Sequence, residues 1–323
     1  MRVFPDKIVA GGSAGLLATV VLLAAGPHVA RAHSDNPQHI VRLGERVADL
    51  DLPARYRARQ LLKRARFHRA RGEAREALAD LELARELGLK ARSARGERGL
   101  VYEILGENKK ALSRLDRFLA KGAPTVATLN ARARLLAAAG RKRDALRDYA
   151  SSLQLAPDIV VFVARGKLLE ELGDYDAAVT CYREGIGRLG RAVLLEMALV
   201  RSELERGQGL VALRIIDDPR APDRKGAAWS ILRSRALELG KRTDDASAEL
   251  DRALTEAGRR VAIRDTAISR LDRARLHEAM GNAVAARADV EAALKLAPTL
   301  QLALEMKSRL DTVGKNTGGE EEG

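Results

Sequence analysis

The 323-residue sequence has few side chains whose spacing would support catalysis. It shows no arrangement of serine, histidine and aspartate, no zinc-binding His-Glu-x-x-His motif, no phosphate-binding loop and no paired acidic motif. The run 185–190 spells Gly-x-Gly-x-x-Gly, but a dinucleotide site needs that loop between a strand and a helix, and no strand is expected before it. The single cysteine, Cys181, excludes an intramolecular disulfide and a multi-cysteine zinc site.

Two histidines near the N-terminus are candidates for a metal site. If the chain is cut after Ala32, His33 becomes the first residue and offers both an amine and an imidazole to a copper ion. His39 would supply a second imidazole. The alternative is a solvated chain terminus that binds nothing.

Residues 1–32 have the pattern of an export signal. Arg2 and Lys7 precede the apolar stretch 8–25, and residues 30–32 read Ala-Arg-Ala, which signal peptidase accepts. We therefore predict cleavage after Ala32 and a periplasmic or secreted protein. The alternative is an uncleaved membrane anchor, because the stretch is only just long enough to span a bilayer.

The composition predicts helices and a basic surface. Aromatic residues make up 3% of the chain, and Ala, Leu, Arg and Glu, which are good helix formers, dominate. The formal net charge is +13, and removal of residues 1–32 would leave 13 − 2 = +11. A polyanionic partner would explain this charge, and so would a GC-rich genome that favours arginine codons. Export argues against nucleic acid as the partner.

Glycines recur along the chain at nearly constant spacing. They stand at Gly72, Gly106, Gly140, Gly173, Gly207, Gly240 and Gly281, with intervals of 34, 34, 33, 34, 33 and 41. Glycine is suited to the end of a helix because it adopts a left-handed backbone at little cost. A period near 34 residues indicates a repeat array in which each unit packs on its neighbours.

Side chains of one type stand at fixed distances from these glycines. Around Gly140 they are Ala133 seven places before, Leu136 four before, Ala145 five after and Tyr149 nine after. Comparable sets surround Gly72, Gly106, Gly173 and Gly281. The pattern resembles the tetratricopeptide repeat, two antiparallel helices joined by a turn. That resemblance implies an all-α, right-handed superhelical solenoid of about seven repeats with capping helices.

Three features depart from the repeat pattern. Phe118 is too large for its small-residue slot, and we expect it to push the helices apart. Val200 and Glu203 replace the usual small and large residues before Gly207. After Gly240 the expected residues come one place late, which indicates one residue inserted in the turn, and a longer insertion is expected near 257–265.

These patterns predict the domain organisation. The predicted parts are a signal peptide 1–32, a cap segment 33–53 with a helix over 38–50, a solenoid 54–298 that is degenerate around 191–265, a capping helix 299–313 and a disordered tail 314–323.

The resemblance also implies where a partner binds. In this family the first helices of the repeats line a concave groove, and the residues thirteen, ten, six and three places before each glycine point into it. The position six before the glycine is basic in five of seven repeats. The resulting candidates are Arg59, Arg66, Arg69, Asn130, Arg134, Lys167 and Arg275. The alternative is an ordinary solvated helix surface.

We expect a non-enzymatic scaffold or adaptor outside the cytoplasm, with no cofactor, that binds an extended or acidic segment of another protein in this groove. Arginine suits that task because its guanidinium binds carboxylates in a bidentate way. One alternative is a binder of anionic envelope polymer or lipid head groups. A second alternative is a copper-handling protein that uses His33.

Overall fold

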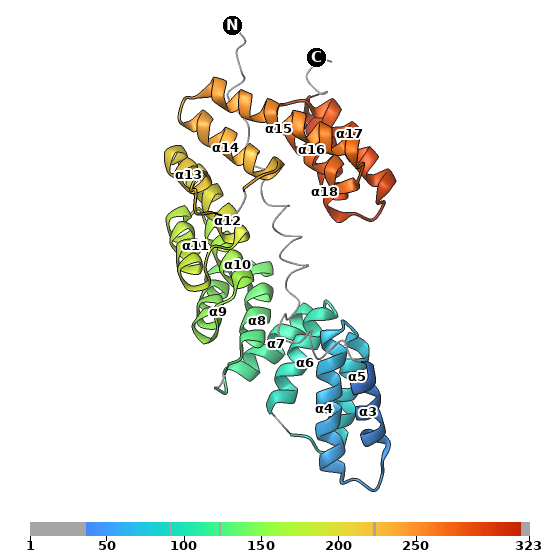
Figure 1. Ribbon diagram of the computed structural model, residues 1–323. Helices are drawn as coiled ribbons and strands as arrows, with labels where there is room; N and C mark the ends of the chain where they lie inside the picture. The colour runs from blue at the N-terminus through green and yellow to red at the C-terminus, as the bar shows by residue number, and fades with distance from the viewer. Residues whose placement is uncertain (1–36, 91, 123, 222–223, 318–323) are drawn as a thin grey trace. The chain divides into compact units, whose positions relative to one another are not determined.

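The described part of the chain is built from helices alone. A computed structural model describes residues 37–90, 92–122, 124–221 and 224–317, and within these ranges there is no strand (Figure 1). The predicted signal peptide and His33 lie outside them. The chain divides into two compact units, a first unit within residues 25–174 and a second unit from residue 175 onward. The all-α repeat solenoid predicted from the sequence is confirmed.

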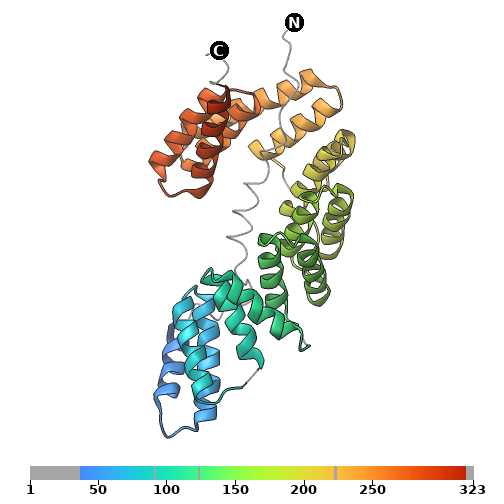
Figure 2. The ribbon, with the colours of Figure 1, turned by 180° about the vertical axis from the view of Figure 1, so that it is seen from behind.

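The first unit contains α3 to α10. Their bounds are α3 Pro37–Ala48, α4 Ala54–Ala70, α5 Ala74–Glu86, α6 Arg92–Ile104, α7 Asn108–Leu119, α8 Val126–Ala138, α9 Lys142–Leu155 and α10 Ile159–Glu170. Helices α4–α5, α6–α7 and α8–α9 pack as pairs, which we name repeats 1, 2 and 3 after their order in the chain (Figure 2). The first helices α4, α6 and α8 also contact one another in series.

The second unit contains α11 to α18. Their bounds are α11 Tyr175–Leu189, α12 Val193–Glu205, α13 Gly209–Ile216, α14 Ala227–Leu239, α15 Thr243–Ile263, α16 Ala267–Ala279, α17 Ala283–Leu296 and α18 Gln301–Thr317. Here α12–α13, α14–α15 and α16–α17 are the paired helices, named repeats 5, 6 and 7. The predicted repeat 4 comprises α10 and α11, which fall on either side of the unit boundary.

The turns between paired helices explain why glycines recur at nearly constant spacing along the chain. Helix α8 begins with a capping box in which Thr125 and Thr128 bond each other's backbone, and it ends just before Gly140. Gly140 has a φ of +78°, and the following Arg141 donates its backbone N–H to the Leu136 carbonyl at 2.8 Å. This arrangement closes the helix through a left-handed residue. The same positive φ occurs at Gly72, Gly106, Gly173, Gly207 and Gly281.

The sixth turn differs from the prediction. Gly240 has a φ of −79°, and the left-handed residue is Lys241, at φ +59°. Counted from Lys241, the residues five, nine and twelve places later are Ala246, Leu250 and Ala253, as in the other repeats. The turn therefore has no inserted residue, and the expectation of one is wrong. The sequence misled because glycine happens to stand one place before the position that requires a left-handed backbone.

The expected separation around Phe118 does not occur, because a glycine makes room for the ring. Phe118 in α7 is buried, and its ring lies so close to Gly96 in α6 that a Cβ added there would sit 3.1 Å from it. At Gly99, one turn on, an added Cβ would lie even closer to its neighbour, 2.8 Å from Leu115. Gly96 of α6 is thus the small residue that accommodates Phe118, and the two helices of repeat 2 pack against each other directly.

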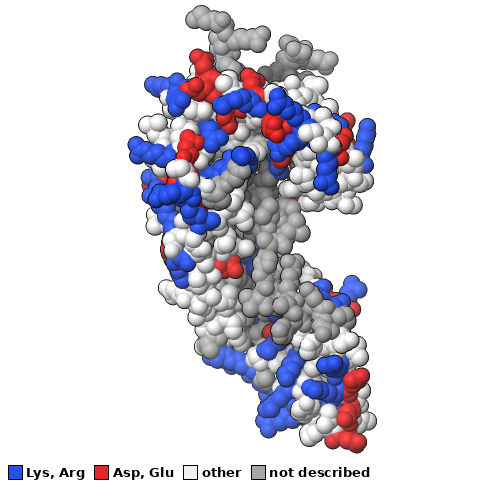
Figure 3. Space-filling model, in the orientation of Figure 1, with Lys and Arg blue, Asp and Glu red and all other residues white. Residues whose placement is uncertain are grey.

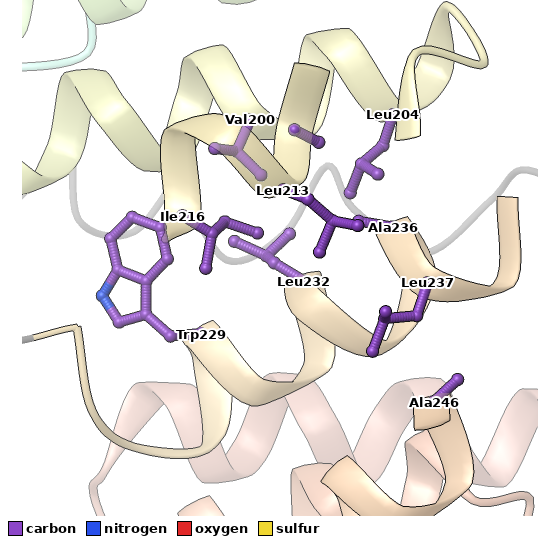
Figure 4. Close-up of a cluster of buried hydrophobic side chains, with 10 residues drawn as sticks. Val200, Leu204, Leu213, Ile216, Trp229, Leu232, Ala236, Leu237 and Ala246 are labelled. Carbon is purple, nitrogen blue, oxygen red and sulfur yellow. The ribbon is translucent and has the colours of Figure 1, made fainter. Parts of the chain in front are cut away.

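Repeat 5 is well packed despite its atypical residues. Trp229, Leu232 and Leu237 of α14 meet Ile216 of α13 and Val200 of α12 in one buried cluster (Figure 4). Glu203, which occupies the usual large apolar slot, is fully buried. It accepts hydrogen bonds from Arg183 and Arg206, both at 2.6 Å. A carboxylate held by two guanidiniums thus replaces an apolar side chain there.

The ends and the late insertion take helical form. The extra residues near 257–265 lengthen α15, which runs to Ile263 and buries Ala257 and Val261. Helix α18 covers the last repeat with Ala303, Met306 and Leu310, and it continues four residues beyond the predicted end at 313. None of the described helices is both long and apolar enough to cross a membrane.

Candidate partner-binding face

Six of the seven predicted binding residues lie on first helices of the first unit. Arg59, Arg66 and Arg69 are on α4, Asn130 and Arg134 are on α8, and Lys167 is on α10. Arg275 is on α16 of the second unit, so the structure does not assign it to the same site. We use the name first-helix face for the surface formed by these residues of α4 and α8 together with the acidic residues of α6 that lie between them.

The arginines of α4 are held by an acidic residue of the next first helix. Glu97 of α6 accepts from Arg66 Nε at 3.0 Å through one carboxylate oxygen and from Arg69 Nε at 2.8 Å through the other. Its side chain is only 12% exposed, whereas that of Arg66 is 45% exposed. The carboxylate is therefore largely covered, and the guanidinium of Arg66 keeps an edge in solvent.

Arg134 of α8 is fixed in the same way from the other side. Its Nε and Nη2 donate to the two oxygens of Glu103 of α6 at 2.7 and 3.0 Å, a bidentate pair. Helix α6 thus supplies a carboxylate to each flanking first helix. The arginines of the first-helix face are oriented by these pairs, and an acidic ligand would have to compete with Glu97 and Glu103 for them.

The same pairing recurs in the second unit. Arg309 of α18 donates to Glu278 of α16 at 2.9 and 2.7 Å, again through Nε and Nη2. Arg235 of α14 donates to Glu205 of α12 at 3.1 Å. Arg235 stands six places before the left-handed Lys241, so it occupies the basic slot of this repeat, whereas a count of six places back from Gly240 ends at Ser234. The misplaced turn at Gly240 is the reason it was missed.

Two residues of the first-helix face have unused polar groups. Arg59 is exposed, and no ion pair to it is found among the residues that the structure describes. The side-chain oxygen of Asn130 is buried and likewise accepts no hydrogen bond from the described residues. Other positions expected to line the groove are closed, because Leu62, Val163 and Leu271 are buried in the core.

Charge is distributed unevenly between the units. Residues 37–174 hold 29 Lys and Arg against 18 Asp and Glu, which gives 29 − 18 = +11. Residues 175–323 hold 25 against 24, which gives +1. Figure 3 shows Lys and Arg over the part of the first unit around α4 and α6. The basic character of the chain is therefore a property of the first unit.

Comparison with known proteins agrees with this architecture. The family model described as "Tetratricopeptide repeat" matches residues 161–188, and no curated protein matches the chain. A tetratricopeptide repeat protein from Parabacteroides merdae is 18% identical, with a TM-score of 0.52 over 79% of this chain and 98% of that one. The C-terminal part of a TPR repeat-containing protein from Cytophaga hutchinsonii is 13% identical, with a TM-score of 0.52 over 76% and 98%. The fold is that of a tetratricopeptide-repeat protein.

A second set of ion pairs runs through these tetratricopeptide repeats and was not predicted. An arginine eight places before the left-handed residue pairs with an acidic residue eight places after it. The pairs are Arg64–Asp80 in repeat 1, Arg132–Asp148 in repeat 3, Arg233–Glu249 in repeat 6 and Arg273–Asp289 in repeat 7. All four carboxylates are buried. The constant separation of 16 residues was available in the sequence as a signal.

No metal site is found among the described residues of the tetratricopeptide repeats. They contain no group of three or more His, Cys, Asp or Glu that could hold a metal ion. His39 is exposed and stacks on Phe67, with ring centroids 5.8 Å apart and planes 9° from parallel. Its proposed partner His33 lies outside the described residues, so the copper hypothesis stays a prediction.

Proposed function

We propose that this protein is a non-enzymatic interaction scaffold and that the first-helix face of its first unit binds an extended segment of another protein. The observation that carries the proposal is the row of arginines held in place by Glu97 and Glu103. Side chains that are already oriented lose little conformational entropy when a partner binds, so they favour affinity.

The ion pairs narrow the kind of partner segment that the first-helix face can bind. Arg59 and the exposed edge of Arg66 can bind carboxylates directly. Arg134 can do so only by sharing its guanidinium with Glu103. Arginines that are free to bind a carboxylate thus lie on the same face as one that is shared. An acidic segment with apolar or neutral residues between its carboxylates fits this arrangement better than a continuous acidic run.

A charge swap tests the proposal. In the double variant Glu103→Arg, Arg134→Glu the ion pair is kept with its direction reversed, and the net charge is unchanged. We expect thermal stability close to that of the wild type, and loss of the partner captured by the wild-type protein from extracts of its source. The single variant Arg134→Glu serves as a comparison, because it places two carboxylates together.

Equal capture by the wild type and the double variant would show that the Arg134–Glu103 pair only holds α6 and α8 together. That result would contradict the proposal. The effect on capture should be larger at low salt, because the Debye length is about 10 Å at 0.1 M and shrinks as salt is added.

We also propose that the protein acts outside the cytoplasm, in the periplasm or as a secreted protein. The support is the sequence pattern of residues 1–32 alone. N-terminal sequencing of the protein purified from its source tests this, with His33 as the expected first residue. A protein that begins at Met1 and remains in the soluble cytoplasmic fraction would contradict it.

A second candidate function is binding to anionic polymer or lipid head groups. The charge of +11 on residues 37–174 favours it, because long-range attraction to a polyanion depends on net charge. Sedimentation with vesicles of anionic lipid, compared with neutral vesicles, tests this candidate. Sedimentation should fall steeply as salt is raised if the binding is electrostatic.

A further inference from the structure

Repeat 2 lacks the internal ion pair between arginine and aspartate that repeats 1 and 3 contain. Its residue eight places before Gly106 is Arg98, as in the paired repeats, but the residue eight places after it is Arg114. In repeats 1 and 3 the same positions hold Arg64 with Asp80 and Arg132 with Asp148. Repeat 2 therefore has the arginine of the pair and, in place of its carboxylate, a second cation.

The sibling repeats show what the arginine at this position ordinarily binds. Arg132 donates from Nε and Nη2 to the two oxygens of Asp148, both at 2.7 Å. Arg64 makes the same two contacts with Asp80 at 2.8 and 2.5 Å. The slot is thus built to present the Nε edge of a guanidinium to one carboxylate.

The hydrogen bonds of Arg98 replace that carboxylate only in part. Its Nη2 donates to the backbone carbonyl of Leu81 in α5 at 2.8 Å. Its Nε is buried and makes no hydrogen bond with any of the described residues. An unsatisfied buried donor on a charged group is costly, so an added acceptor would be favourable there.

The surroundings of Arg98 are cationic. Burial lowers the pKa of Arg98, and the positive charges of Arg85 in α5 and Arg114 in α7 lower it further, while Tyr102 and Glu82 act weakly in the opposite direction. Arg85 and Arg114 are both exposed. Two exposed guanidiniums, one from α5 and one from α7, therefore act on the half-buried Arg98, together with one acidic residue, Glu82.

We propose that Arg98, Arg85 and Arg114 form a carboxylate-binding site between α5, α6 and α7 that receives an acidic side chain of a partner protein. The incoming carboxylate takes the place of the aspartate that repeats 1 and 3 carry themselves. This site is separate from the first-helix face, and it does not depend on whether that face binds a segment.

The direct test restores the missing acid. In the variant Arg114→Asp the sequence of repeat 2 matches repeats 1 and 3, and the introduced carboxylate would pair with Arg98. We expect a higher Tm in buffer without multivalent anions, because the buried Nε gains its acceptor. Affinity for a fluorescently labelled hexaglutamate peptide should fall about tenfold or more.

The matched control is Arg117→Asp, which makes the same change of charge one turn further along α7. Arg117 is exposed, and the affinity of this variant for hexaglutamate should change much less than that of Arg114→Asp. A hexaglutamine peptide should bind neither the wild type nor the variants.

Three results would overturn the proposal. The first is an equal loss of hexaglutamate binding in both variants, which would mean attraction to the overall charge only. The second is no hexaglutamate binding by the wild type. The third is displacement of the peptide by inorganic phosphate at concentrations at which acetate has no effect, which would assign the site to phosphate groups.

Discussion

At the scale of single residues, the fold depends on one left-handed position per repeat. The sequence predicted these positions from glycine alone and was right in every turn but the sixth, where Lys241 takes the left-handed conformation and Gly240 does not. Residue type alone could not locate the sixth turn. Glycine is the residue usually expected at the left-handed position, and here it stands directly before the residue that adopts this conformation. The one-place delay of Ala246, Leu250 and Ala253 was the physical signal that the turn had moved.

Alanine at two of these glycines should therefore have different effects. Gly140→Ala should lower the free energy of unfolding by about 1 kcal/mol, because a Cβ disfavours φ near +78°. Gly240→Ala should have no such cost, since its φ of −79° suits any residue. Urea denaturation of both variants measures the difference. Equal destabilisation would contradict the assignment of the sixth turn to Lys241.

Tyr149 gives a pH prediction at the same scale. Burial in α9 raises the pKa of its phenol to about 12, and the unfolded chain should titrate near 10. The neutral phenol is therefore favoured in the folded state, and this contribution is lost as the pH rises from about 10 through the folded pKa. Tyr149→Phe should show a shallower loss of stability than the wild type between pH 10 and pH 12. Parallel curves for the two proteins would contradict a buried neutral phenol.

At the scale of elements, the helices and their pairing followed from spacing, whereas the details of packing did not. The predicted helix over 38–50 and α3 at Pro37–Ala48 agree within two residues at each end. The room for Phe118 depends on Gly96, and their contact requires knowing which faces of α6 and α7 meet. Ion pairs such as Arg134–Glu103 likewise join successive repeats, so a reading of one repeat at a time could not find them.

The contact between Phe118 and Gly96 can be tested with a pair of substitutions. Gly96→Ala should destabilise the protein, because its Cβ would lie about as close to the ring as 3.1 Å. Phe118→Leu in the same chain should recover part of that loss by opening space. A double-mutant cycle measured by chemical denaturation gives the coupling between the two positions. Additive effects would mean that the ring does not limit the space at Gly96.

At the scale of the whole molecule, both units are built from the same kind of repeat, but they differ in net charge. The sequence predicted the repeat number, the all-α class and the first helices as the place to look for a binding surface. It could not show that Glu97 and Glu103 hold the arginines there, because those contacts arise only when neighbouring repeats stack. We therefore propose the first-helix face of the first unit as the surface that binds a partner.

Site-specific photo-crosslinking tests that claim most directly. A photoreactive phenylalanine is placed at Arg59 or at Ala127, exposed positions on the first helices α4 and α8. For comparison it is placed at Arg75 or at Arg143, exposed positions on the second helices α5 and α9. In extracts of the source organism, we predict that one partner is crosslinked from positions 59 and 127 and not from positions 75 and 143. Crosslinking of that partner from the second-helix positions alone would contradict the account.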